Sequence, residues 1–92
     1  MHEMKLKYKF VLKEISGKVI GIAVGRDNEL FNGMVKLNST GGFIFELLNN
    51  QDLSEDQIVT ALCEKYDISG EKARDTAQRF LEYLRQNELL AE

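Results

Sequence analysis

Within VKLNSTGGFIFELL, residues 35–48, the sequence changes from the pattern of a strand to that of a helix. Residues 31–37 alternate between two faces, as in a strand with one buried side. Beyond them apolar residues recur at helical spacing, which predicts a short helix capped by Asn38 or Thr40. The glycine pair at 41–42 opens this helix, although glycine costs roughly 1 kcal/mol in a helix interior relative to alanine. We therefore expect both glycines to let the helix start tight against the strand it follows, where a Cβ would hold the backbones apart.

The residues before this segment have the pattern of a two-stranded hairpin. Tyr8, Phe10 and Leu12 alternate with Lys7, Lys9 and Lys13. Ser16 and Gly17 form a turn signal, and the apolar run 19–24 has the character of a second strand. With the strand at 31–37, this predicts a three-stranded antiparallel sheet.

The residues after the segment predict two more helices. Residues 54–57, Ser-Glu-Asp-Gln, have the sequence of a capping box and precede an apolar stripe from Ile58 to Tyr66. Ser69 is a second N-cap candidate, followed by an apolar stripe within residues 73–84. The sequence therefore predicts an α+β fold of winged-helix type, in which a three-stranded antiparallel sheet is followed by three helices.

Composition is typical of one globular domain. The chain has 92 residues, of which 43% are apolar and 29% charged, so we expect residues 1–92 to form a single domain with residues 1–5 flexible. The net charge of −3, from 12 basic and 15 acidic residues, disfavours binding through nucleic-acid phosphates. No signal-like or membrane-spanning segment is evident, and the lone Cys63 has no disulfide partner. These features predict a cytoplasmic protein without a membrane partner.

The sequence offers little for catalysis. His2 is the only histidine and lies in the terminus expected to be flexible. Cys63 lies on a helical apolar stripe, where a buried and inert thiol is expected. The glycine pair at 41–42 lacks the Lys-Ser/Thr sequence that completes a phosphate-binding loop. We therefore expect no catalytic residues, no metal site and no cofactor.

The order of these motifs resembles that of the PqqD-like family, small domains also called RiPP recognition elements. LKEISGKVIGIAVG (residues 12–25) resembles the family's first hairpin, and FNGMVKLNSTGGFIFELL (residues 31–48) resembles its third strand and first helix. IVTALCEKYDISGEKARDTAQRFLEYLRQNELL (residues 58–90) is similar to the two following helices and the terminal apolar pair. Two positions depart from the family pattern: Phe45 stands where many members have tryptophan, and Thr76 where an aspartate is common.

The resemblance implies a peptide chaperone that is not itself an enzyme. Members of the family bind the leader segment of a ribosomally synthesised precursor peptide and present it to a modifying enzyme, such as a radical-SAM protein or a protease. In the family, the leader adds as an extra strand beside the third strand and packs against the third helix. Strand addition needs an open row of backbone N–H and C=O groups, which the last strand of a three-stranded meander has.

The predicted peptide-binding residues come from this edge strand and from one stripe of the last helix. They are Asn32, Gly33, Met34, Val35 and Lys36 on the strand, and Arg74, Gln78, Leu81 and Arg85 on the helix. The cationic residues of this set, among them Lys36, would suit an acidic leader peptide. The simpler interpretation is that they are charged side chains exposed to solvent. Met34 is also compatible with an exposed side chain that has no binding role, and Leu81 with an ordinary core residue. The sequence leaves open which alternate residues of the strand turn their N–H groups toward a guest.

Two other interpretations are compatible with the pattern. One is a DNA-binding winged helix that places its last helix in the major groove. Basic residues on that helix, such as Lys72 and Arg79, are interleaved with acidic ones, such as Asp75 and Glu82, which is more typical of a solvated helix surface. The other is a non-catalytic subunit of a larger enzyme. We expect peptide, and not nucleic acid, to be the partner.

Overall fold

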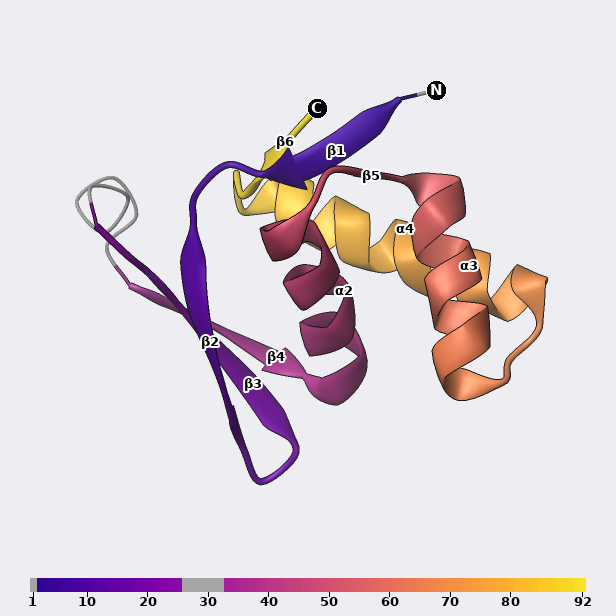
Figure 1. Cartoon of the computed structure of the whole chain (residues 1–92), viewed down its shortest axis with the longest axis horizontal. Helices are drawn as coiled ribbons and strands as arrows, with labels where there is room; N and C mark the ends of the chain where they lie inside the picture. The colour runs from indigo at the N-terminus through magenta and orange to yellow at the C-terminus, as the bar shows by residue number, and fades with distance from the viewer. Residues whose placement is uncertain (1, 26–32) are drawn as a thin grey trace.

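The computed structural model describes residues 2–25 and 33–92. These residues form two small sheets and three helices, arranged as in Figure 1. Along the chain the elements are β1 (Glu3–Leu6), β2 (Phe10–Ile15), β3 (Lys18–Ala23), β4 (Met34–Asn38), α2 (Ser39–Asn50), β5 (Leu53–Ser54), α3 (Glu55–Tyr66), α4 (Gly70–Gln86) and β6 (Leu90–Ala91). The predicted α+β fold, with an antiparallel sheet followed by three helices, is confirmed.

The main sheet is the predicted meander, with strand order β2-β3-β4. Ser16 and Gly17 link β2 to β3 with φ angles of 51° and 79°, as the tight hairpin turn of two left-handed residues requires. In β4, Val35 and Leu37 are buried while Met34 and Lys36 are exposed, so the predicted alternation of faces is confirmed. The predicted strand began at Phe31; the start of that strand, with Asn32, lies outside the described residues.

A second sheet, which the sequence did not lead us to expect, contains the N-terminal segment. Strand β1 lies between β5 and β6 and pairs antiparallel with both. Residues 3–5, expected to be flexible, are therefore part of a strand. The physical reason is burial, since Met4 is 2% exposed and Leu6 7% exposed. The N–H of Lys7 donates to the carbonyl of Leu89 at 2.8 Å, which ties the N-terminal strand to the end of the chain.

The glycine pair has the structural role predicted for it, with different neighbours. Asn38 caps α2 by accepting a hydrogen bond from the N–H of Gly41 at 2.7 Å. A Cβ at Gly42 would lie 2.6 Å from Cβ of Val19 on β3, and a Cβ at Gly41 would lie 2.9 Å from the ring of Phe80 on α4. The close approach is thus to β3 and α4 and not to β4, the strand that α2 follows.

The remaining helices begin as predicted. Ser54 and Gln57 form a capping box with hydrogen bonds of 2.8 and 3.2 Å, and Ser69 accepts a hydrogen bond from the N–H of Lys72 at 3.1 Å. The core lies between the main sheet and the helices; its largest fully buried side chains are Ile44, Phe45, Ile58, Leu62, Leu81, Leu84 and Leu89. Among the described residues, no helix is long and apolar enough to span a membrane.

Candidate functional site

The direction of the backbone groups in the main sheet follows from one hydrogen bond at the open end of the β2–β3 hairpin. The N–H of Val24 donates to the carbonyl of Lys9 at 3.0 Å. Hydrogen-bonded and non-bonded pairs alternate along antiparallel strands. Because Phe10 and Ala23 form the next pair, their N–H and C=O groups point away from each other. On β3, Ala23 and every second residue before it therefore turn these groups toward β4.

The same alternation extends to β4. Gly21 belongs to the set that faces β4, and its partner there is Val35. Val35 and Leu37 therefore direct their backbone groups toward β3, whereas Met34 and Lys36 direct theirs away from the sheet. Within the described part of the chain, no hydrogen bond reaches these outward groups. The edge of β4 is thus free to pair with a further strand.

The opposite edge of the sheet, formed by β2, is partly closed. The side-chain oxygen of Asn49 on α2 accepts a hydrogen bond from the N–H of Phe10 at 3.1 Å. Its amide nitrogen donates to the carbonyl of Phe10 at 2.8 Å. These bonds agree with the alternation above, because they require the backbone groups of Phe10 to point away from β3. A side chain therefore occupies the β2 edge where a guest strand would start to pair.

Beside the β4 edge, a pocket of about 290 Å³ lies between the end of β4, the start of α2, and α4. Its α4 wall contains Phe80 and Tyr83, whose rings stack with centroids 5.8 Å apart. Tyr83 is 38% exposed, and Thr76 and Arg79 flank the pair. On the α2 side the fully buried Ile44 contributes apolar surface. The pocket combines apolar walls with hydroxyl groups and lies next to a free strand edge.

Two of the predicted helix residues, Arg74 and Gln78, lie elsewhere. Arg74 donates to the carboxylates of Glu55 and Asp56, each at 2.7 Å, and Gln78 donates to Glu55 at 3.1 Å. Both residues line a separate and wider hollow of about 870 Å³ beside α3. Their polar groups are thus engaged with the start of α3, on the side of α4 away from β4.

The other two predicted helix residues are also directed away from the β4 edge. Leu81 is fully buried, and the guanidinium of Arg85 donates to Glu92 at 2.9 and 3.1 Å. At 100° per residue, the predicted stripe points roughly 160° away from the mean direction of the α4 residues Thr76, Phe80 and Tyr83. The structure therefore does not place the predicted stripe along the pocket beside β4, because the stripe faces the opposite side of the helix.

A signal in the sequence could have found the pocket-lining residues. Buried Ala73 and Ala77 mark the centre of the apolar stripe of α4, and each side of that stripe borders a different neighbour. Phe80 and Tyr83 form an aromatic pair three residues apart on one flank. Half-exposed aromatic rings on a core boundary are more typical of a binding surface than the charged residues on the other flank.

The contact between Arg85 and Glu92 predicts a pH effect on stability. Hydrogen bonds from Arg85 and, second, from His2 lower the pKa of Glu92 from an ordinary value of 4.5 to about 2. Because the pKa of Glu92 is lower in the folded than in the unfolded protein, its ionised carboxylate stabilises the fold at pH values above about 4.5. This stabilisation is lost as the pH falls from about 4.5 toward about 2. In urea denaturation, wild type should be more stable than Glu92→Gln at pH 5, and the difference should shrink as the pH falls and vanish below about pH 2. A difference that is constant across this range would contradict the assignment.

The groups considered for catalysis are not assembled into a catalytic arrangement in the described part of the chain. His2 is exposed and lies 3.1 Å from Glu92. Cys63 is half-buried, and so less enclosed than expected. Among residues 2–25 and 33–92, no group of three or more His, Cys, Asp or Glu side chains could hold a metal ion.

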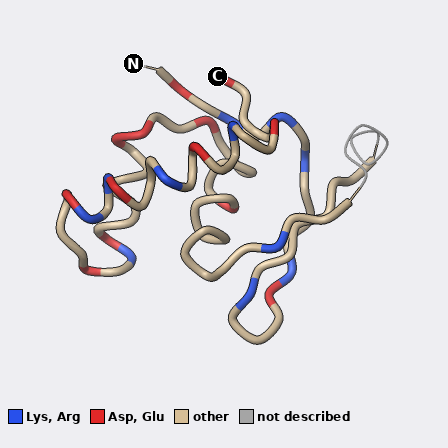
Figure 2. The backbone as a smooth tube through the Cα atoms, turned by 180° about the vertical axis from the view of Figure 1, so that it is seen from behind, with Lys and Arg blue, Asp and Glu red and all other residues tan. Residues whose placement is uncertain are grey.

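Charge is divided between the main sheet and the helices, as Figure 2 shows. Residues 7–25 and 33–38, which form the sheet, contain five lysines and one glutamate, a formal charge of +4. Residues 39–92 contain eleven acidic and five basic residues, a formal charge of −6. The free edge therefore belongs to the positively charged part of a negatively charged chain, which favours an acidic ligand there.

A small α+β domain with a free sheet edge beside an aromatic-lined pocket is a scaffold suited to binding extended peptides. The chain belongs to the PqqD family, because the sequence profile described as coenzyme PQQ synthesis protein D matches residues 10–90. A solved structure described as TbiB1 in complex with the TbiA(beta) leader peptide has a similar fold, with a TM-score of 0.69 and 23% sequence identity. The match covers 94% of this chain and 93% of that one. No curated protein sequence matches the chain significantly.

Proposed function

We propose that the protein binds the leader segment of a ribosomally synthesised precursor peptide by strand addition and presents it to a modifying enzyme. The guest strand would pair with the outer edge of β4. The observation that carries the proposal is the outward row of backbone groups at Met34 and Lys36, which have no partner among residues 2–25 and 33–92. The last residue of the same strand, Asn38, lines the pocket. In strand addition, such a row supplies affinity, and adjacent pockets supply the choice of side chains.

The binding residues in this proposal differ in part from those expected from the sequence. On the strand, Gly33 to Lys36 keep their role: Met34 and Lys36 provide backbone groups, and Val35 holds the strand to β3. On α4, the flank that includes Phe80 and Tyr83 forms the wall of the peptide-binding pocket, in place of the predicted stripe. Family membership supports the proposal, as does the similar fold of a protein solved with a leader peptide.

In this proposal the chain, residues 1–92, is a binding module that works without chemistry of its own. The enzyme that receives the peptide would be a radical-SAM protein or a protease, as the resemblance implies. The complex would form in the cytoplasm, where ribosomes make the precursor.

The charges of α4 support a peptide and not a nucleic acid as the ligand. Arg74, Arg79 and Arg85 each form an ion pair with a carboxylate, at 2.7, 3.0 and 2.9 Å respectively. Arginines engaged in this way are less available to phosphates, whose neutralisation provides most of the affinity of DNA-binding helices.

The pocket assignment is tested by two variants on opposite sides of α4. The ligand is the leader peptide identified by mass spectrometry of peptides that the immobilised protein retains from its native cell. Tyr83→Ala removes an aromatic wall and should weaken binding of the labelled leader about three- to tenfold, since an interface aromatic truncation typically costs of the order of 1 kcal/mol. Gln78→Ala, on the predicted stripe, should leave the affinity unchanged. Fluorescence anisotropy measures both, and the reverse ranking would restore the stripe as the binding wall.

A further inference from the structure

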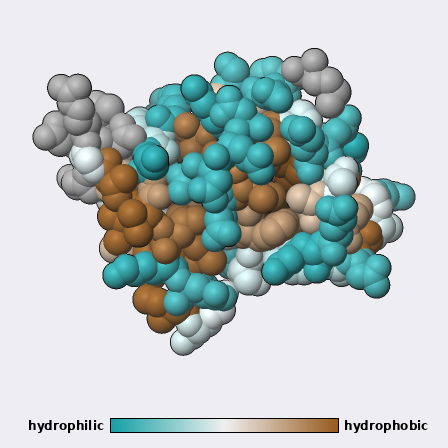
Figure 3. Space-filling model, in the orientation of Figure 1, coloured by the Kyte–Doolittle hydropathy of each residue, from teal (hydrophilic) through white to brown (hydrophobic). Residues whose placement is uncertain are grey.

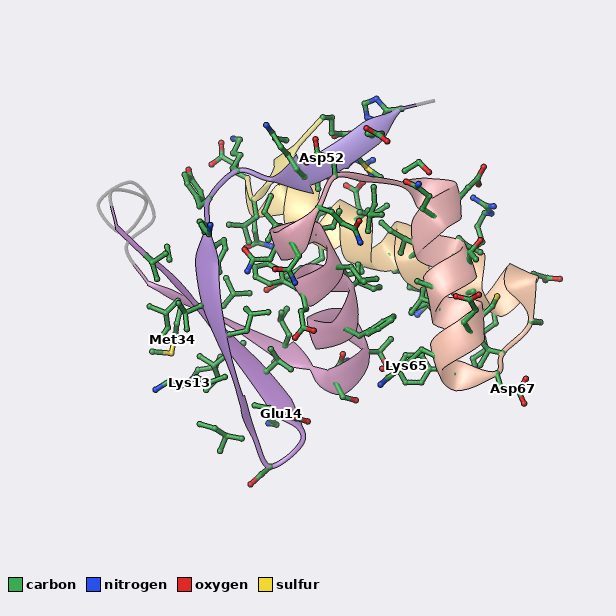
Figure 4. All side chains as sticks on the ribbon, viewed as in Figure 1. Lys13, Glu14, Met34, Asp52, Lys65 and Asp67 are labelled. Carbon is green, nitrogen blue, oxygen red and sulfur yellow. The ribbon has the colours of Figure 1, made fainter. Side chains whose placement is uncertain are left out.

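The outer face of the main sheet carries an exposed apolar row that ends at the free edge. Val11 pairs with Ile22, and Ile22 pairs with Met34, so the three side chains lie next to one another across β2, β3 and β4. They are 49%, 36% and 53% exposed. Figure 3 shows apolar surface gathered over this part of the molecule, and Figure 4 shows Met34 projecting away from the helices.

The neighbouring row on the same face ends in a positive charge. Lys13 pairs with Ile20, and Ile20 pairs with Lys36. Both lysines are exposed, and neither takes part in a salt bridge among the described residues. The β4 edge therefore presents an apolar side chain and, two residues later, a cationic one.

We propose that the guest strand continues both rows, so that it carries an apolar side chain beside Met34 and an acidic side chain beside Lys36. The residue between these two lies beside Val35 and points to the inner face of the sheet, where Val35 is buried. This inference rests on the proposed function and specifies the ligand: a peptide with an apolar and an acidic residue two positions apart, separated by an apolar or aromatic one.

The geometry of antiparallel sheets supports this pattern. Met34 and Lys36 turn their backbone groups outward, so guest residues opposite them would form the hydrogen-bonded pairs. Side chains of directly opposite residues lie about 5 Å apart at Cβ and interact, with opposite charges favourable and like charges unfavourable. The positive sheet adds a longer-range attraction to the acidic residue.

Selection from a random decapeptide library displayed on yeast tests the proposal. The library is sorted on wild type and on two charge reversals, Lys36→Glu and Lys13→Glu. Lys13→Glu is a matched control, because Lys13 carries the same charge as Lys36 and lies in the same cross-strand row. Lys13 is, however, three strand spacings, about 14 Å, from the guest strand. This distance exceeds the Debye length in physiological salt.

Peptides selected on wild type should be enriched in Asp or Glu two positions from an apolar residue. On Lys36→Glu the acidic position should change to Lys or Arg, and on Lys13→Glu it should stay acidic. In one selected synthetic peptide, replacing the acidic residue with lysine should weaken binding to wild type about two- to fivefold. The same replacement should strengthen binding to Lys36→Glu.

Two results would overturn the inference in distinguishable ways. Peptides that lose binding to Lys36→Pro but show no charge preference at any position would leave strand addition intact and refute the pairing with Lys36. Peptides that bind Lys36→Pro as tightly as wild type would refute both strand addition at β4 and the pattern derived from it.

Discussion

Replacing Lys36 with proline is expected to weaken binding of the leader peptide about tenfold or more while the fold stays intact. The N–H of Lys36 points away from β3, so proline removes no hydrogen bond from the sheet, and an edge strand tolerates it. The guest loses one backbone hydrogen bond, and its carbonyl is left unpaired, at a cost of about 1–3 kcal/mol. Circular dichroism checks the fold and fluorescence anisotropy the affinity. Met34→Pro should behave in the same way.

Three further variants serve as controls. Glu14→Pro places proline at an exposed, outward-facing position on the β2 edge, so it should leave both fold and binding unchanged. Val35→Pro removes an N–H that pairs with β3 and should strongly destabilise the domain. Val35→Ala keeps that N–H and separates loss of the side chain from loss of the hydrogen bond. If Glu14→Pro reduced binding and Lys36→Pro did not, the guest would add to β2 instead.

Among substitutions that leave the backbone hydrogen bonds of the sheet in place, Gly42→Ala should have the largest effect on stability. A Cβ here would lie 2.6 Å from Cβ of Val19, an atom fixed to the β3 backbone, so α2 or β3 must move. Overpacking of this kind costs about 1–3 kcal/mol, against a gain of roughly 1 kcal/mol from placing alanine in a helix. Because the contact is with an atom fixed to the backbone, we expect the upper part of this range, a net loss of about 1–2 kcal/mol. The melting temperature should then be lower by roughly 5–15 °C, since 1 kcal/mol corresponds to about 4–8 °C for a domain of this size.

The matched variant is Gly41→Ala in the same helical turn. Its Cβ would meet the ring of Phe80 at 2.9 Å, and a side-chain ring shifts more easily than a strand, so the loss of stability should be smaller. In the double variant, Val19→Ala should restore part of the stability lost in Gly42→Ala, because it removes both γ carbons near the new methyl group. Thermal unfolding by circular dichroism measures each variant. A Gly42→Ala protein as stable as wild type would refute the close-packing role.

Local chemistry in the sequence determined the elements of the main sheet and the starts of the helices. Ser16 and Gly17 supply the turn, Asn38, Ser54 and Ser69 supply the caps, and each acts through groups within a few residues. The alternation of buried and exposed residues in β4 is equally local, because side chains in a strand alternate regardless of the partner. These features were therefore predictable from sequence.

The N-terminal strand was missed because its signal is weak in isolation. Met4 and Leu6 alternate with Glu3 and Lys5, but four residues near a chain end form a strand only when partners exist. Those partners, β5 and β6, have two residues each and lie far along the chain. Pairing across such sequence distances depends on how the helices bring the segments together.

Only the tertiary structure decided which groups face a guest. The outward direction of Met34 and Lys36 depends on the register between three strands, which is fixed by side-chain packing and by the hairpin turn together. The pocket depends on which flank of the apolar stripe of α4 turns to β4 and which to α3. Both flanks satisfy the same helical periodicity, so the sequence pattern alone does not distinguish them. The packing of α3 against one flank leaves Phe80 and Tyr83 on the other, beside the free strand edge.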